Sequence, residues 1–212
     1  MTTHRSHSEA AVTGASQDAD AGAEHVATSR RRMLALLPAA GLAGLAGVMA
    51  IGLTRDPSIL PSALIGRKVP EFSLPPVRGR KLGLASADLL GAVSLVNFFA
   101  SWCVACREEH AVLLDLRASG TVPLYGIDYK DEPADGEAWL NSFGDPYQRT
   151  GADLDGRVAV DWGLYGVPET YVVDAGGIIQ HRHVGAVTKQ DLQEIILPLV
   201  AASRQTKPGT PS

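Results

Sequence analysis

The cysteine content restricts this chain most, because only two cysteines occur, Cys103 and Cys106, and they lie three positions apart. A disulfide framework needs several well-separated pairs, so the fold must be stabilised by a hydrophobic core. With 212 residues, 45% hydrophobic and 20% charged, the chain has room for one well-buried domain and an appendage. The formal net charge of −4 argues against nucleic acid as a partner.

The N-terminal part contains a candidate membrane anchor. Residues 1–32 are rich in Ala, Ser, Thr, Asp and His, which predicts a disordered tail. Three arginines, Arg30 to Arg32, precede an uncharged run over 33–53 that is long enough to cross a bilayer once as a helix. By the positive-inside tendency the tail is cytoplasmic, so we expect a single-pass protein of the inner membrane with its domain in the periplasm or an equivalent extracytoplasmic space.

Two other interpretations of this segment stay open. Val48-Met49-Ala50 offers small residues for cleavage of a signal peptide, and residues 29–34 resemble a twin-arginine signal. The apolar run is longer than a usual signal core, which favours an uncleaved signal-anchor. Residues 54–62, with Pro57 and Pro61, predict a linker.

Residues 63–203 predict one domain in which strands and helices alternate, followed by a tail over 204–212. Apolar runs and helical periodicity predict strands over 93–99 and 122–127, helices over 103–118, 134–143 and 188–202, and a hairpin over 170–173 and 178–184. The β-α-β-α order favours parallel pairing through right-handed crossovers, so the fold class is α/β.

The cysteine pair predicts thiol–disulfide exchange. Placed where a strand leads into a helix, Cys103 lies at the helix N-terminus, where free N–H groups and the dipole favour a thiolate. Cys106 lies one turn further, close enough to release a trapped partner. Cys103 is therefore predicted as the nucleophile and Cys106 as the resolving thiol.

Three other functions fit the pair less well. A structural zinc site needs four ligands, and His110 is the nearest helper. An inert disulfide across two residues would gain little loop entropy. A Cu(I) carrier would use two soft thiolates, but no Met-rich or His-rich cluster accompanies them. No cofactor or metal is expected beyond the redox-active disulfide.

Three motifs carry a resemblance to a known family. The segments Phe99-Ala100-Ser101-Trp102-Cys103-Val104-Ala105-Cys106-Arg107, Tyr125-Gly126-Ile127-Asp128-Tyr129-Lys130-Asp131 and Gly163-Leu164-Tyr165-Gly166-Val167-Pro168-Glu169-Thr170 stand in this order. Together they resemble the DsbE/CcmG-type thiol:disulfide oxidoreductases of cytochrome c biogenesis, the TlpA-like branch of the thioredoxin superfamily. The resemblance implies a thioredoxin-like fold, in which a central mixed β-sheet is flanked by helices.

The resemblance also implies a function. It predicts a reductant for the Cys-x-x-Cys-His cysteines of apocytochrome c or of a maturation component, supplied with electrons by a DsbD/CcdA-type membrane donor. A reductase for other exported proteins or for a copper-site assembly factor is the alternative. Val104 stands where family members often carry proline, so the redox poise is not transferable.

Further site residues follow from the same motifs. Pro168 resembles the cis-proline that faces the active-site disulfide, and Val167 before it is expected to pair with an incoming peptide. Trp102, Tyr165 and Tyr129 are expected to shape the substrate groove. A plain surface turn explains Tyr129 nearly as well.

Two acids are candidate site residues. Asn97 stands where related reductases often bury an aspartate, so that acid is missing. Glu109 shares a helix face with Cys106, and burial there would raise its pKa and let it exchange a proton with Cys106. Glu169 matches another family glutamate. Arg107, Glu108 and His110 are expected on the opposite, solvent-facing side of the helix.

Overall fold

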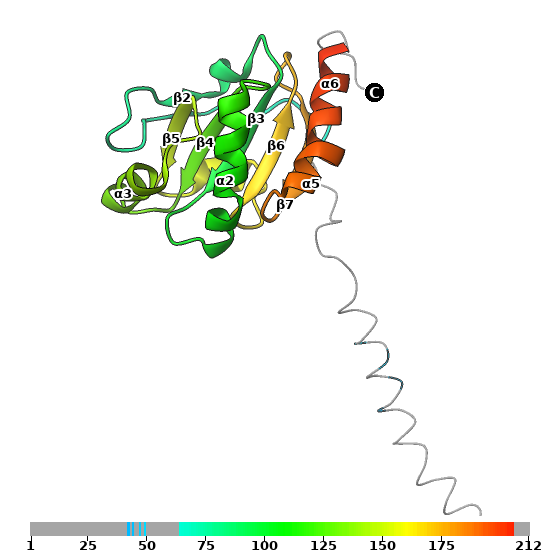
Figure 1. Cartoon of the computed structure of the whole chain (residues 1–212), viewed down its shortest axis with the longest axis horizontal. Coiled ribbons are helices and arrows are strands. Elements are labelled where there is room, and N and C mark those ends of the chain that lie inside the picture. The colour runs from blue at the N-terminus through cyan, green and yellow to red at the C-terminus, as the bar shows by residue number, and fades with distance from the viewer. Residues whose placement is uncertain (1–41, 43, 45–46, 48, 50–63, 206–212) are drawn as a thin grey trace, which may run out of the picture. The chain divides into compact units, whose positions relative to one another are not determined.

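The computed structural model describes residues 42, 44, 47, 49 and 64–205 (Figure 1). The chain divides into two compact units, Met1–Pro57 and Ser58–Ser212, and the second contains the domain. In the first unit the four described positions are helical. Among the described residues no helix is both long and apolar enough to span a membrane. The predicted anchor over 33–53 falls almost entirely outside the described residues, so it stays a prediction.

The domain contains one central sheet and one small one. Its elements in chain order are β1 (Ser73–Leu74), β2 (Leu84–Ala85), η2 (Ser86–Leu89), β3 (Ser94–Phe99), α2 (Val104–Ser119), β4 (Leu124–Tyr129), α3 (Pro133–Phe143), β5 (Arg149–Asp153), α4 (Arg157–Asp161), β6 (Glu169–Val173), β7 (Ile179–Val184), α5 (Lys189–Asp191), the π-helical η3 (Leu192–Ile196) and α6 (Leu197–Gln205). The central sheet has the order β5-β4-β3-β6-β7, and β1 pairs with β2.

The central sheet is mixed, as expected. Strand β3 pairs parallel with β4, and β4 pairs parallel with β5, whereas β6 runs antiparallel to both β3 and β7. All six side chains of β3 are buried, because this strand lies in the middle of the sheet with a core on each face. The two parallel steps follow from the helical crossovers that connect these strands.

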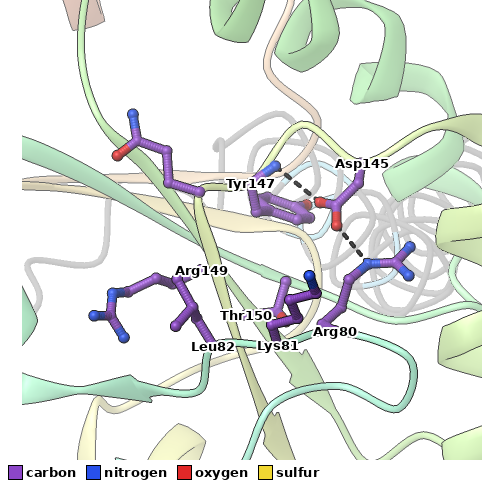
Figure 2. A pocket seen from close by; sticks show the side chains of 8 residues that line it. Arg80, Lys81, Leu82, Asp145, Tyr147, Arg149 and Thr150 are labelled. Carbon is purple, nitrogen blue, oxygen red and sulfur yellow. Dashed lines mark hydrogen bonds and ion pairs between the residues drawn. The ribbon is translucent and has the colours of Figure 1, made fainter.

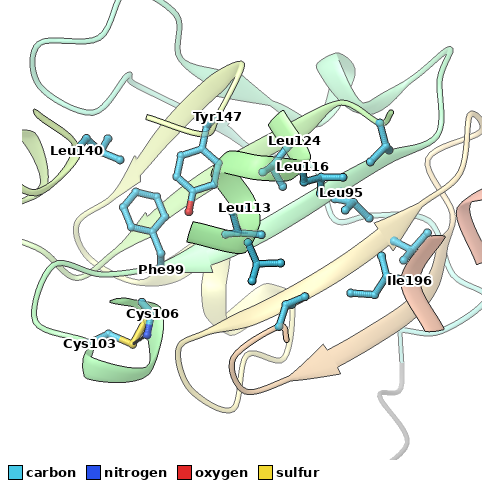
Figure 3. Close-up of a cluster of buried hydrophobic side chains, with 14 of the residues drawn as sticks. Leu95, Phe99, Cys103, Cys106, Leu113, Leu116, Leu124, Leu140, Tyr147 and Ile196 are labelled. Carbon is cyan, nitrogen blue, oxygen red and sulfur yellow. Dashed lines mark hydrogen bonds between the residues drawn. A yellow bond between two sulfur atoms is a disulfide. The ribbon is translucent and has the colours of Figure 1, made fainter. Parts of the chain in front are cut away.

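Two hydrophobic clusters cover the two faces of the sheet. Leu95 and Phe99 of β3 pack with residues of α2, α3 and the C-terminal helix, and Cys103 and Cys106 belong to this cluster (Figure 3). Val96 and Phe98 of the same strand pack on the other face with Trp162. The active-site pair therefore stands at the end of a continuous core.

The predicted elements are present, with small shifts of their ends. The hairpin strand β6 begins at Glu169, and the C-terminal helical segment continues to Gln205, beyond the predicted end at Ala202. The sequence did not predict β1, β2, β5 or α4. Strand β5 reads Arg-Thr-Gly-Ala-Asp, which lacks both an apolar run and a clear alternation.

Candidate active site

Cys103 and Cys106 form a disulfide at the N-terminus of α2, as Figure 3 shows. Cys103 is the N-cap residue and Cys106 lies within the first turn, as the strand-to-helix pattern predicts. Cys103 is 7% exposed and Cys106 is 1% exposed. Of the two cysteines, Cys103 is the better placed to meet a partner.

The helix end is arranged to stabilise negative charge on Cys103. The backbone N–H of Cys106 donates a hydrogen bond to the Cys103 Sγ at 3.0 Å. After reduction the same N–H points at the thiolate, and the helix dipole adds to its stabilisation. Both effects favour Cys103 over Cys106 as the attacking thiolate.

The peptide bond between Val167 and Pro168 is cis, as the resemblance implies. The carbonyl oxygen of Val167 lies 3.5 Å from the Cys103 Sγ. The backbone before the proline thus borders the reactive sulfur. An extended peptide that pairs with this backbone would bring its own cysteine to Cys103.

Exposed apolar side chains occur next to Cys103 in the chain and in the loop before the cis-proline. Trp102 is 57% exposed, Val104 76% and Tyr165 76%, although all three are large hydrophobic residues. The Trp102 and Tyr129 rings lie 6.4 Å apart, and the Trp102 Nε1 donates to the carbonyl oxygen of Lys130 at 3.3 Å. Exposed apolar groups next to a reactive bond are typical of a protein-binding surface.

Glu109 is buried beside the core, one turn along α2 from Cys106, and is 1% exposed. Its carboxylate accepts hydrogen bonds from Asn97 Nδ2 at 2.9 Å and from the Val187 N–H at 2.8 Å. Asn97 in turn accepts a hydrogen bond from the Tyr147 hydroxyl at 2.7 Å. Asn97, which the sequence marked only as a missing acid, therefore orients Glu109.

Burial raises the pKa of Glu109 from 4.5 to about 7, and the hydrogen bonds from Val187 and Asn97 oppose the rise. The carboxyl can therefore gain or lose a proton near neutral pH, as a proton-transfer group must. Its role toward Cys106 stays a prediction.

Replacing Glu109 by Gln should change how the rate of mixed-disulfide release depends on pH. In the unsubstituted chain, release of the mixed disulfide by Cys106 should accelerate as pH rises through about 7, where Glu109 becomes able to accept a proton. Glu109→Gln should remove this increase of the rate with pH and slow release at pH 8 by on the order of tenfold. Stopped-flow kinetics at a series of pH values measures it, with Glu108→Gln as the exposed control.

The same substitution should affect stability with a defined sign. Because the folded-state pKa is raised, the stability that Glu109 contributes is fully present below pH 4.5 and is lost as pH rises through about 7. The free energy of unfolding of the Glu109→Gln chain should not show this decrease as pH rises. A pH–rate profile and a pH–stability profile both equal to those of the unsubstituted chain would exclude Glu109 from the mechanism.

Glu169 is fully buried and paired, unlike a solvated acid at a strand end. The guanidinium of Arg182 donates to both carboxylate oxygens, each at 2.7 Å. The Tyr165 N–H at 2.8 Å, the Gly166 N–H at 3.3 Å and the Tyr171 hydroxyl at 2.7 Å also donate to this carboxylate. Glu169 therefore anchors the loop before Pro168 to the β6–β7 hairpin and does not contact the disulfide.

His110 does not face solvent, contrary to the expectation from its helix position. It is 5% exposed, its ring packs on Trp139 with centroids 4.4 Å apart, and its Nε2 lies 3.1 Å from the Gly144 carbonyl oxygen. Helix α3 covers this side of α2, so a second buried face exists that helical periodicity alone did not reveal. Arg107 and Glu108 are exposed, as expected.

The described residues contain no group of three or more His, Cys, Asp and Glu side chains that could hold a metal ion. One pocket lies along β5, next to Tyr147 (Figure 2). Two of its basic residues are paired, Arg80 with Asp145 and Arg149 with Asp88. Neither cysteine lines this pocket, which is therefore separate from the disulfide.

Known proteins resemble this chain in sequence and fold. Residues 65–182 match the AhpC/TSA family model. The thiol:disulfide interchange protein DsbE of Allochromatium vinosum is 42% identical over 85% of this chain and 99% of its own length. DsbE of Pseudomonas aeruginosa is 44% identical over 80% and 93%, and HelX of Rhodobacter capsulatus 39% over 80% and 97%, respectively.

Solved structures agree on the fold. A DsbE-type protein from Chlorobium tepidum superposes with a TM-score of 0.56 at 24% identity, covering 66% of this chain and 96% of that one. A secreted disulfide oxidoreductase from Mycobacterium tuberculosis gives a TM-score of 0.52 at 19% identity, covering 62% and 96%.

The fold and the Cys103–Cys106 disulfide beside a cis-proline define a thioredoxin-like thiol:disulfide oxidoreductase. The relatives narrow this class further. The chain belongs to the DsbE family of thiol:disulfide interchange proteins.

Proposed function

We propose that this chain is a membrane-anchored, extracytoplasmic reductant of apocytochrome c. Its substrate would be the disulfide of the Cys-x-x-Cys-His motif, which must be reduced before haem attachment. A DsbD/CcdA-type membrane protein would return electrons to Cys103 and Cys106. Membership of the DsbE family supports this function, and the arginines before the uncharged run over 33–53 support the anchor.

The observation that carries the proposal is the position of Val167 beside the reactive sulfur. Its carbonyl oxygen lies 3.5 Å from Cys103 Sγ, Val167 is partly exposed, and the exposed Tyr165 lies two residues before it in the chain. A short, extended segment of an unfolded protein can pair with such a backbone edge. An apocytochrome before haem attachment offers a segment of this kind.

The reaction proceeds in two exchanges. The Cys103 thiolate attacks one sulfur of the substrate disulfide, forming a mixed disulfide and releasing the other substrate sulfur as a thiolate. The Cys106 thiolate then attacks the Cys103 Sγ, which releases the second substrate cysteine and forms the Cys103–Cys106 disulfide. Two electrons pass to the substrate, and Glu109 takes up the proton that Cys106 loses.

A Cys106→Ala chain tests the proposal in cells, because the Cys103 thiolate can still attack but no second thiol can release the partner. We expect a stable mixed disulfide with an apocytochrome c or a maturation component, attached through a Cys-x-x-Cys-His cysteine. We also expect this adduct in the membrane fraction. Mass spectrometry of the purified adduct identifies the partner, and a Cys103→Ala, Cys106→Ala chain is the control.

Other partners would contradict the proposal in defined ways. A varied set of exported proteins would support a general extracytoplasmic reductase, and a copper-binding assembly protein would support that narrower alternative. An adduct in the soluble fraction alone would contradict the anchor.

A further inference from the structure

Asp131 fastens the loop that leads into the active site. Its Oδ2 accepts a hydrogen bond from the Ser101 N–H at 2.6 Å, and its Oδ1 accepts one from the Ser101 hydroxyl at 2.7 Å. Ser101 lies two residues before Cys103, between the end of β3 and the start of α2. Asp131 is only 6% exposed, and both hydrogen bonds are partly buried.

A second acid, Asp128, lies behind Asp131 in the core. It is 1% exposed and pairs across the sheet with Phe99, the last residue of β3. A Cβ at Gly136 would collide with the Asp128 Oδ2, so α3 packs directly against this carboxyl group. Within the described residues no donor reaches Asp128 Oδ1.

A buried carboxylate without donors is costly, so this environment favours the neutral acid. Asp131 contacts Asp128 through a side-chain hydrogen bond. Because the Asp131 oxygens already act as acceptors toward Ser101, the proton in the bond between the two acids belongs to Asp128. Burial first, and then the charge of Asp131 and this bond, raise the pKa of Asp128 from 3.8 to about 8.

Few other titratable groups act on this pair. On the same face of the sheet Tyr147 is buried against Gly126, and burial raises its pKa, so the phenol stays neutral. Glu109 lies beyond Tyr147 and is held by Asn97, and Asp145 is paired with Arg80. On α3, Glu137 pairs with Arg78. Asp131 is the charge that bears on Asp128.

We propose that Asp128 and Asp131 form one proton-sharing pair of positioning residues that holds Ser101 and makes the reactivity of Cys103 depend on pH. With its proton, Asp128 donates to Asp131 and the pair carries a single charge. Without it, two buried carboxylates repel each other, the hold on Ser101 weakens, and extra negative charge near the N-terminus of α2 disfavours the Cys103 thiolate. This inference concerns the exchange reaction itself and does not depend on which protein is the substrate.

The test is the rate at which the reduced full-length chain attacks a neutral dipyridyl disulfide, measured from pH 6 to 10. In the unsubstituted chain we expect the rate, relative to Asp128→Asn, to fall on the order of threefold as pH rises through the Asp128 pKa. Asn keeps a donor toward Asp131 but cannot ionise, so Asp128→Asn should lack this decrease. Glu108→Gln removes an exposed charge on α2 and should still show the decrease in rate.

Thermal unfolding provides a second readout. As pH rises from about 4 through about 8, the unsubstituted chain should lose stability, because the pKa of Asp128 is raised in the folded state. Asp128→Asn lacks this loss, so its Tm should increase relative to that of the unsubstituted chain over the same range. Ratios of rate and differences in Tm that do not vary with pH would overturn the proposal and leave Asp128 a purely structural residue.

A third measurement keeps Asp128 in place and therefore applies even if the Asp128→Asn chain does not fold. In a Glu109→Gln chain, infrared spectra should show a protonated buried carboxyl at pH 7 that disappears as pH rises through about 8. The absence of such a band at pH 7 would overturn the proposal.

Discussion

Replacing Cys103 by Ala should abolish thiol–disulfide exchange. Cys103 is the N-cap of α2, where the Cys106 N–H and the helix dipole stabilise its thiolate, and it adjoins the Val167 carbonyl oxygen. Cys106 is 1% exposed and cannot substitute for it as the attacking group. Reduction of a disulfide-linked fluorescent peptide, followed in time, should fall to the rate without protein.

The matched control is Cys106→Ala. This chain should still attack the peptide once per molecule and then stop as a mixed disulfide, so the two alanine variants differ in kind. Equal turnover by Cys103→Ala and the unsubstituted chain would show that the assignment of the nucleophile is wrong. Turnover by Cys106→Ala at the normal rate would remove Cys106 from the mechanism.

Replacing Arg182 by Met should destabilise the fold by about 3–5 kcal/mol, because it leaves Glu169 as a buried carboxylate without its partner. Glu169 is 0% exposed, and Arg182 donates to both of its oxygens. Urea unfolding of the domain measures the loss. The loop that Glu169 holds at Tyr165 leads to Pro168, so exchange should slow as well.

Two comparisons distinguish a buried pair from a surface pair. Arg78 also pairs with a glutamate, Glu137, but its side chain is 63% exposed, so Arg78→Met should cost less than about 1 kcal/mol. Adding Glu169→Gln to Arg182→Met should recover part of the loss, since the unpaired charge is removed. Equal effects of Arg78→Met and Arg182→Met would contradict this account of Glu169.

The sequence predicted the elements whose pattern is local. Strand β3 is mostly apolar, and α2 begins directly after its N-cap Cys103 and ends before Gly120, whose φ of 62° suits a glycine at a helix end. Strand β5 carries little signal of its own because segments distant in the chain cover it and bond to it: Leu74 packs on Gly151, and the Ala152 N–H donates to the carbonyl oxygen of Pro75. Such pairing depends on tertiary structure.

In the site too, the features with a local sequence pattern were predicted and those that depend on tertiary contacts were not. The shared helix face predicted that Glu109 is buried near Cys106, and the motif predicted a cis bond before Pro168. No local pattern connects Glu169 to Arg182 or Asp131 to Ser101, because these contacts depend on strand register and on the end of a neighbouring strand. The available signals were the position of Asp131 at the end of a motif segment and that of Arg182 in the predicted hairpin.

The most direct test of the account is a single turnover of the reduced full-length chain with oxidised apocytochrome c, quenched with acid and counted by mass spectrometry. The account predicts that one Cys-x-x-Cys-His disulfide is lost for each Cys103–Cys106 disulfide formed, and faster than with an unrelated disulfide protein of the same concentration. Formation of the Cys103–Cys106 disulfide at equal rates with both proteins would contradict a dedicated role. No loss of the apocytochrome disulfide would contradict the proposed function outright.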